Sequence, residues 1–393
     1  MPWTLVLGLG VGQIISWGAL IYSIAVLGSP MAKDLGVSST VVFGAFSASL
    51  VVSGLAGPRV GKLIDRRGGR SVLAWGSVGA AASLAALAWA PNVTTFFLAW
   101  IFAGMARAMT LYEAAFATLS QHTDKSFRNS VTAITLLGGL AGTVFFPLSL
   151  FGLEHIGWRG TLACFAAAQV LLCLPLHVLC IPAAAARRSI GEPASTAAAS
   201  ATARPAPAAS FAALSASFAL SAFITSAIAV HVINLLQARG LGIASAVFVA
   251  SLIGPMQLTG RLLEFALGRR FSSVLIGAST LVLLVLSLAI LAFVDAQLST
   301  ALLFALTYGC ANGIQTIVRG TVPAELFGRQ GYGHTVGRLA APSFIARAVA
   351  PLALTLTASP QLGMNFSVPL LIGIAALALI SYVVATRHAL KLA

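Results

Sequence analysis

The sequence predicts an all-α membrane protein with twelve transmembrane helices arranged as two similar halves. Three observations carry this prediction: an apolar composition, twelve apolar runs of membrane-spanning length, and short sequences that recur between the halves. Of the 393 residues, 59% are hydrophobic and only 8% are charged, whereas a soluble domain carries about 25% charged residues. A water-soluble fold has too little interior for this much apolar surface, so that class is excluded.

Twelve segments are apolar over about 20 residues, the length that crosses the hydrocarbon core as an α-helix. The first is too long for the apolar region of a cleaved signal peptide and follows no charged region, so we interpret it as the first membrane helix. The expected helices cover residues 4–28, 38–59, 72–90, 93–121, 128–153, 158–181, 210–235, 243–268, 272–294, 298–322, 335–358 and 364–386.

One stretch between the sixth and seventh runs differs in composition. Residues 182–209 are rich in Ala, Pro, Ser and Thr, a composition that cannot bury a core. We therefore expect an N-terminal six-helix bundle in 1–181, a cytoplasmic linker in 182–209 and a C-terminal six-helix bundle in 210–393.

The basic residues are distributed unevenly between the two faces of the membrane. If both termini lie on one face, that face carries all of the 23 Lys and Arg residues except six. Those six are Lys33, Arg159 and Arg239 on the opposite face, and Arg107, Arg319 and Arg347 within the apolar runs. The positive-inside rule places the basic face in the cytoplasm, together with both termini and the linker. The net charge of +14 then indicates contact with anionic lipid headgroups and not nucleic-acid binding.

Two short sequences recur at equivalent places in the two halves. Gly61-Lys62-Leu63-Ile64-Asp65 reappears as Gly260-Arg261-Leu262-Leu263-Glu264, each at the cytoplasmic end of the second helix of its half. Gly104-Met105-Ala106 reappears as Gly309-Cys310-Ala311, each in a fourth helix. Such internal repeats are typical of membrane transporters.

The residues from Gly61 to Arg70 resemble the loop signature of the major facilitator superfamily, roughly G-x-L-x-D-R-x-G-R-R between helices 2 and 3. The matching positions are Gly61, Leu63, Asp65, Arg66, Gly68 and Arg70, and Gly69 stands in place of an Arg. The sequence Gly157-Trp158-Arg159 after the fifth helix also resembles a family landmark. The resemblance covers nearly the whole chain, and it implies two pseudo-symmetric six-helix bundles and secondary transport by alternating access.

The resemblance also implies a gating role for the loop. In the family, the acidic residue of the signature meets the N-terminus of helix 11, whose positive dipole end favours a carboxylate. Here Asp65 would take that role near residues 335–340, while Gly61 and Gly68 would permit tight turns. Arg66 and Arg70 would order the loop or contact lipid phosphates.

Ionisable and polar groups within the spans are the candidate site, because charges in the hydrocarbon region are costly and usually functional. In the superfamily, helices 1, 4, 7 and 10 line the central cavity. The candidate substrate-binding residues are Arg107, Arg319, Arg347, Asn312, Gln315, Gln13 and Trp17, and the candidate proton-coupling residues are Glu113 and His231.

Each candidate also has a plain structural interpretation. Arg107, Glu113 and Arg319 would form an ion pair that locks the bundle. Arg347 would bond backbone carbonyls near Pro342 or Pro351. His231 would be a hydrogen-bonded wall residue, while Gln13 and Trp17 would serve packing.

The balance of these charges favours an anionic substrate. Three arginines against one carboxylate leave a surplus cation, which is costly when buried, and arginine grips carboxylate or phosphate with its planar fork. Within the superfamily the chain resembles bacterial relatives of the monocarboxylate and oxalate carriers. It departs from them at Gln257, where they have a mid-membrane cation on helix 8. We therefore expect a carrier for a small organic anion, by proton symport or by exchange.

Two rival functions were weighed. The first is an efflux transporter for drugs or toxic metalloids, for which Cys173 and Cys180 on the sixth helix are candidate thiol ligands. The second is a receptor or channel, which the repeat and the loop signature disfavour. No enzyme site, cofactor site, metal site or nucleotide-binding P-loop is predicted. The expected partners are a small-molecule substrate, a proton or counter-ion and membrane lipids, for a monomer in the bacterial inner membrane.

Overall fold

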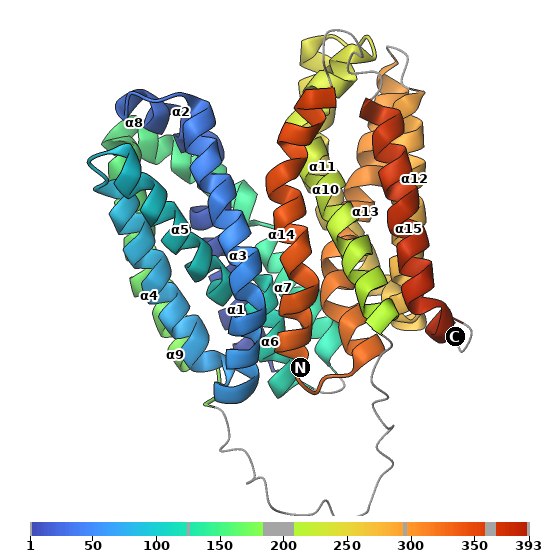
Figure 1. Ribbon diagram of the computed structural model, residues 1–393, viewed down its shortest axis with the longest axis horizontal. Helices are drawn as coiled ribbons and strands as arrows, with labels where there is room; N and C mark the ends of the chain where they lie inside the picture. Colours follow the sequence, from blue (N-terminus) through green and yellow to red (C-terminus); the bar gives the residue numbers. More distant parts are fainter. Residues whose placement is uncertain (1, 124–125, 184–207, 294–296, 358–366, 391–393) are drawn as a thin grey trace, which may run out of the picture. The chain divides into compact units, whose positions relative to one another are not determined.

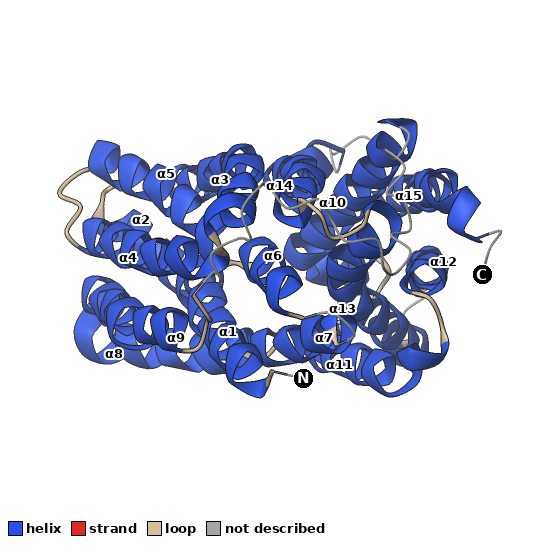
Figure 2. Ribbon diagram, turned by 90° about the horizontal axis from the view of Figure 1, so that it is seen from below, coloured by secondary structure: helices blue, strands red, loops and turns tan. Residues whose placement is uncertain are grey.

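The computed structural model describes residues 2–123, 126–183, 208–293, 297–357 and 367–390. Throughout these ranges every regular element is a helix, and none is a strand (Figure 2). A lipid-exposed chain satisfies its backbone hydrogen bonds within each helix, since the hydrocarbon core offers no water. The predicted all-α class is therefore confirmed. Most of the expected linker, residues 184–207, lies outside the described residues.

Figure 1 shows the helices of the described residues. In chain order they are α1 (Trp3–Trp17), η1 (Gly18–Tyr22), α2 (Ser23–Asp34), α3 (Ser39–Arg67), α4 (Gly69–Ala88), α5 (Val93–Thr110), α6 (Tyr112–His122), α7 (Phe127–Gly138), α8 (Ala141–Ala168), η2 (Gln169–Cys173), α9 (Leu174–Leu179), α10 (Ala208–Ala238), α11 (Ile243–Leu267), η3 (Gly268–Arg270), α12 (Ser273–Ala292), α13 (Leu298–Phe327), α14 (Tyr332–Thr357) and α15 (Ser367–Leu390).

Ten helical stretches among the described residues are long and apolar enough to cross a membrane. One of them, Phe127–Leu179, spans 53 residues and contains a non-helical Gly157 with φ +69°, so it has the length of two crossings. Helix α14 has 26 residues but is not among the ten. The described residues are thus consistent with the predicted twelve helices. The protein is a multi-pass membrane protein.

The chain divides into two compact units, which are described here one at a time. The first comprises Met1–Ser49, Ala56–Ala208 and Pro323–Gly337, and the second comprises Leu50–Leu55, Ala209–Val322 and Arg338–Ala393. The stretch Pro323–Gly337, called the docking segment below, therefore packs in the first unit although α13 and α14 otherwise belong to the second. Leu50–Leu55 of α3 likewise belongs to the second unit although the rest of α3 belongs to the first.

Aromatic and small residues alternate in the core of the first unit. Trp100, Phe96, Phe145 and Phe165 are buried there among alanines and leucines. In the second unit, Tyr382 of α15 packs over Gly277 of α12, and its hydroxyl donates to the Val274 carbonyl at 3.0 Å. In a bilayer no hydrophobic effect drives helices together, so their association depends on close van der Waals packing. Small residues allow that close approach.

Candidate functional site

The loop signature is mostly helical. Helix α3 continues to Arg67, and α4 begins at Gly69, so the turn consists of Gly68 alone, with φ +83° and ψ +157°. Only glycine adopts such a conformation readily, which explains that position. Arg66 and Arg67 lie in the last turn of α3, where cations are favoured by the helix dipole. The expectation of a turn at Gly61 was wrong, because Gly61 lies inside α3.

Gly61 instead allows a close helix contact. A Cβ at this position would overlap the carbonyl of Gly333 in the docking segment. A second glycine pair, Gly57 and Gly337, repeats the contact one turn further along each helix. The backbones of α3 and α14 therefore approach each other through four glycines, a packing mode common in membrane proteins.

Asp65 accepts two hydrogen bonds at the start of α14. Its Oδ1 accepts from the Gly333 amide at 2.9 Å, and its Oδ2 accepts from the His334 amide at 2.8 Å. The first amides of a helix have no intrahelical partner, so the carboxylate caps them and meets the positive end of the dipole. The contact lies just before the 335–340 region expected from the sequence. His334 Nδ1 adds a hydrogen bond to the Pro58 carbonyl at 3.1 Å.

Helix 4 of the expected series is interrupted where the candidate residues lie. The helix α5 ends at Thr110, and Leu111 is extended with φ −81° and ψ −171° before α6 begins. The freed Thr110 carbonyl accepts a hydrogen bond from Gln13 Nε2 at 2.7 Å. Sequence reasoning missed this break, because neither Gly nor Pro is present at 110–112. Discontinuous helices of this kind frame the substrate sites of many transporters.

Gln13 and Trp17 belong to a connected polar and aromatic group. Trp17 Nε1 donates to Gln13 Oε1 at 3.1 Å, so both ends of the Gln13 amide are paired. The Trp17 ring lies 6.1 Å from that of Tyr22 and 5.1 Å from that of Tyr112. Trp17 and Tyr22 are half-buried and therefore accessible in part, whereas Gln13 is fully buried.

Arg107 lies wholly inside the first unit. Its side chain is 1% exposed. The guanidinium donates to Ser49 Oγ on α3 and to the Leu20 carbonyl in the π-helical turn η1. Phe46 and Trp100 lie beside it, with ring centroids 4.6 and 5.2 Å from Cζ. In this arrangement the cation is enclosed by protein groups, so a substrate would reach it only if the Ser49 or Leu20 contact opened.

Glu113 lies in the first turn of α6 and is half-buried. It is within electrostatic range of the Tyr332 hydroxyl, as is Arg329. Tyr332 opens α14 inside the docking segment. The candidate coupling carboxylate therefore lies beside the same segment that Asp65 caps.

The second unit holds the other candidate residues on three helices. Asn312 of α13 accepts a hydrogen bond from Thr225 of α10 at 3.2 Å. Arg319 of α13 and Arg347 of α14 are both half-buried, and the Arg347 guanidinium lies 5.8 Å from the Phe344 ring centroid. The Arg347 carbonyl accepts from Ser226 at 2.8 Å. These helices thus bring the predicted amides and arginines into one bundle.

Both polar side-chain atoms of Gln315 lack a hydrogen-bond partner in the part of the chain that the structure describes. The residue is 4% exposed. A buried amide without partners costs about 1–3 kcal/mol, so it calls for a water or a ligand at that point.

His231 of α10 forms a hydrogen bond with the neighbouring α14. Its Nε2 donates to the carbonyl of Pro351, one of the two prolines within α14, at 3.0 Å. The ring is 8% exposed. The contact employs one of the two ring nitrogens that a proton shuttle would need.

The cysteines of the rival interpretation are packed against α1. Cys173 is fully buried, with Sγ 4.0 Å from the Gly12 carbonyl, and Cys180 fills the space beside Gly8. The described residues contain no group of three or more His, Cys, Asp or Glu able to hold a metal ion.

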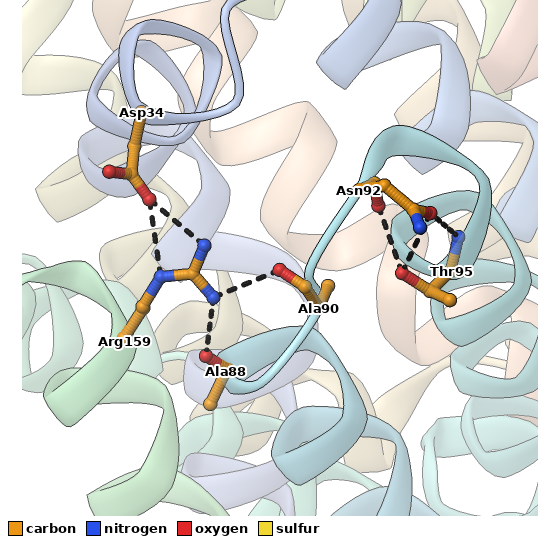
Figure 3. Close-up of polar contacts among 6 residues, drawn as sticks. All are labelled: Asp34, Ala88, Ala90, Asn92, Thr95 and Arg159. Carbon is orange, nitrogen blue, oxygen red and sulfur yellow. Dashed lines mark hydrogen bonds and ion pairs between the residues drawn. The ribbon is translucent and has the colours of Figure 1, made fainter.

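Arg159 joins three chain segments at one end of the first unit (Figure 3). Its guanidinium contacts Asp34 at the end of α2 at 3.0 Å, and it donates to the carbonyls of Ala88 and Ala90 at 2.8 and 3.0 Å. The Ala88 carbonyl ends α4, where the helix leaves it unpaired, and Ala90 follows just after that helix. The Gly157-Trp158-Arg159 landmark is thus a structural clamp: Gly157 makes the turn and Arg159 ties the ends together.

Comparisons with known proteins agree with this architecture. No curated protein matches the sequence. Three solved structures share the fold: the human organic anion transporter MFSD10 (TETRAN), the proton:xylose symporter XylE bound to 6-bromo-6-deoxy-D-glucose, and the transporter FucP in the outward conformation. Their identities are 17%, 14% and 12%, with TM-scores of 0.72, 0.72 and 0.71. The alignments cover 98%, 96% and 95% of this chain and 99%, 94% and 97% of those chains.

At these identities the structures show the fold alone, and the family is shown by a sequence model. The model of the Major Facilitator Superfamily matches residues 9–351, which include the loop signature, the helix break at Leu111 and the polar residues of α13. Members of this family are transporters of small molecules and not enzymes. This chain belongs to the Major Facilitator Superfamily.

Proposed function

We propose that this transporter carries a small organic anion by alternating access, with proton coupling or exchange. One observation supports the proposal most: Arg107, Arg319 and Arg347 lie within the apolar runs, where Glu113 is the carboxylate at similar depth. A net positive charge in a low-dielectric interior is costly, and a substrate anion would reduce that cost. The unused Gln315 amide supplies a further donor for a carboxylate oxygen.

The arginines of the second unit are the proposed anion ligands. Arg319 and Arg347 are half-buried, so part of each side chain lies at the surface of the protein, whereas Arg107 is enclosed. Arginine binds carboxylate through two parallel N–H donors. The proposed carrier works as a monomer in a bacterial inner membrane with both termini in the cytoplasm.

We expect Arg319→Gln and Arg347→Gln each to abolish thermal stabilisation by the substrate. Each change removes a charge-assisted contact worth about 1.5–3 kcal/mol, which is roughly a tenfold to hundredfold loss of affinity. The measurement is a melting-temperature screen of the purified protein against oxalate, lactate, a cationic drug and arsenite. Counterflow of the radiolabelled hits in liposomes then follows.

Arg270→Gln is the matched control, because Arg270 lies exposed at the cytoplasmic end of α11. It makes the same change of charge outside the proposed site and should leave the stabilisation unchanged. If both variants keep wild-type counterflow, or if the drug or arsenite is the preferred solute, the anion proposal is wrong. The second of these outcomes would instead support the rival efflux function.

Glu113→Gln tests proton coupling. The amide mimics the protonated acid, so we expect the variant to bind the anion and to support exchange, while uptake driven by a pH gradient is lost. Comparing counterflow with gradient-driven accumulation in the same liposomes separates the two steps. Accumulation that survives in Glu113→Gln would exclude this carboxylate as the coupling group and make His231 the next candidate.

A further inference from the structure

The docking segment is held in the first unit by more than the Asp65 contact. It contains the end of α13, a loop from Gly328 to Gly331, and the start of α14. Gly328 and Gly331 both have positive φ, +75° and +65°, conformations that favour glycine. The two glycines therefore fold the loop tightly and place Arg329, between them, against the first unit.

Arg329 contacts the end of a helix. Its guanidinium donates to the Ser120 carbonyl at 2.7 Å, in the last turn of α6, where carbonyls lack intrahelical partners. The negative end of the α6 dipole favours a cation at this place. The guanidinium also lies over the Phe127 ring at 4.9 Å, an attractive cation–π geometry.

The Asp65 and Arg329 contacts are opposite in sign and in direction. Asp65 extends from α3 of the first unit to the amides that begin α14. Arg329 extends from the loop before α14 to a carbonyl that ends α6. Each charge therefore meets the helix end of opposite polarity. Asp65 lies on α3 and contacts the docking segment, whereas Arg329 lies in the docking segment and contacts α6.

Tyr332 lies in the chain between Arg329 and Gly333, the residues that make the two contacts. It is fully buried, and its ring packs edge-on against Phe127 with centroids 5.5 Å apart. Arg329 and Tyr332 thus share one aromatic neighbour at the start of α7. Three contacts therefore hold the docking segment: the Tyr332–Phe127 ring contact and the hydrogen bonds of Arg329 and Asp65.

We propose that Arg329 is a second anchor of the docking segment, acting together with Asp65. This inference rests on the proposed alternating-access function, in which the segment must leave α3 and α6 for the cytoplasmic end to open. Arg329 is a positioning residue in this scheme: it touches no substrate and sets how readily the segment departs. Loss of either anchor should therefore increase the fraction of time that the segment is released.

The test uses a reporter that needs no substrate. Ala117 of α6 is fully buried, and its Cβ lies 3.1 Å from the place where a Cβ of Gly333 would stand, so the docking segment covers it. In full-length protein whose four native cysteines are replaced, Ala117→Cys would react with a maleimide only when the segment leaves. The rate of its alkylation in liposomes then measures release.

We expect Arg329→Gln to raise the alkylation rate about tenfold, equivalent to about 1.4 kcal/mol. Asp65→Asn should do likewise, and the double variant should exceed either alone. Arg329→Lys should give a rate between those of the parent and Arg329→Gln, because lysine can still donate to the Ser120 carbonyl. Arg270→Gln should leave the rate at the parent value. A parental rate in Arg329→Gln, in a protein where Asp65→Asn is accelerated, would overturn the proposal.

The two proposals fail separately in this design. If no tested anion is transported but alkylation responds to Arg329→Gln, then the anchor holds and only the proposed substrate is wrong. If anion counterflow is normal in the parent and alkylation ignores Arg329, the substrate proposal holds and the anchor is wrong.

Discussion

Gly61→Ala is expected to abolish transport while the protein still inserts and folds in the membrane. A single methyl group at this position would overlap the Gly333 carbonyl, a backbone atom that cannot rotate away. Overpacking of this kind costs about 1–3 kcal/mol or more, and here the cost falls on the seating of the docking segment. The Asp65 hydrogen bonds to Gly333 and His334 would lengthen with it, so the anchored arrangement would become rare.

The matched control for this substitution lies on the same helix. Gly44 also belongs to α3, and a Cβ there would meet nothing within 4 Å. Because alanine is favoured over glycine in helices by about 1 kcal/mol, Gly44→Ala should be neutral or slightly stabilising. The measurements are counterflow in liposomes and alkylation of the Ala117→Cys reporter. Wild-type counterflow in Gly61→Ala would show that the close contact at Gly333 is unnecessary for the transport cycle.

Hydropathy predicted the helices well because the bilayer leaves the backbone few alternatives. It could not predict how each helix is built inside. The break at Leu111 and the π-helical turn η1 contain no proline and occur at residues that fit an ordinary helix. Their cause is tertiary: Gln13 takes the Thr110 carbonyl and Arg107 takes the Leu20 carbonyl, so each irregularity is stabilised by a partner distant in sequence.

For the loop signature too, the sequence predicted where a contact lies but not all of the interactions that form it. The resemblance led to Asp65 and to the start of helix 11, and the contact found at Gly333 and His334 lies there. It did not reveal that Gly61 serves a backbone contact, because a glycine in sequence fits a turn and a close approach equally well. Arg329 was counted only as one of many basic cytoplasmic residues, since nothing in its sequence marks the helix end that it meets.

The position of a residue within an apolar run likewise did not predict whether its side chain points into the protein core or toward the surface. Arg107 and Arg347 both lie within apolar runs, and the sequence treats them alike. In the structure Arg107 is 1% exposed among Ser49, Leu20 and two aromatic rings, whereas Arg347 is half-buried on α14. Which face of a helix a side chain occupies depends on the packing of its neighbours, and a single hydropathy profile does not contain that information.

Arg107→Ala is expected to be the most destabilising replacement among the arginines of the spans. It removes two charge-assisted hydrogen bonds and two cation–π contacts, and it leaves a cavity where a large buried side chain stood. Large-to-alanine changes in a core cost about 3–5 kcal/mol, and the Leu20 carbonyl would lose its Arg107 donor as well. We therefore expect a lower melting temperature and a reduced yield of monodisperse protein.

The variants Arg107→Lys and Arg270→Ala complete the test. Lysine keeps the charge but loses the planar fork that joins Ser49 to Leu20, so its melting temperature should lie between those of the wild type and Arg107→Ala. Arg270→Ala, at an exposed position, should melt like the wild type. This order would assign Arg107 to holding α3 and η1 together. Should Arg107→Ala instead melt like the wild type yet lose stabilisation by the anion, the guanidinium would act on the substrate itself. The Ser49 and Leu20 contacts would then have to open during the cycle.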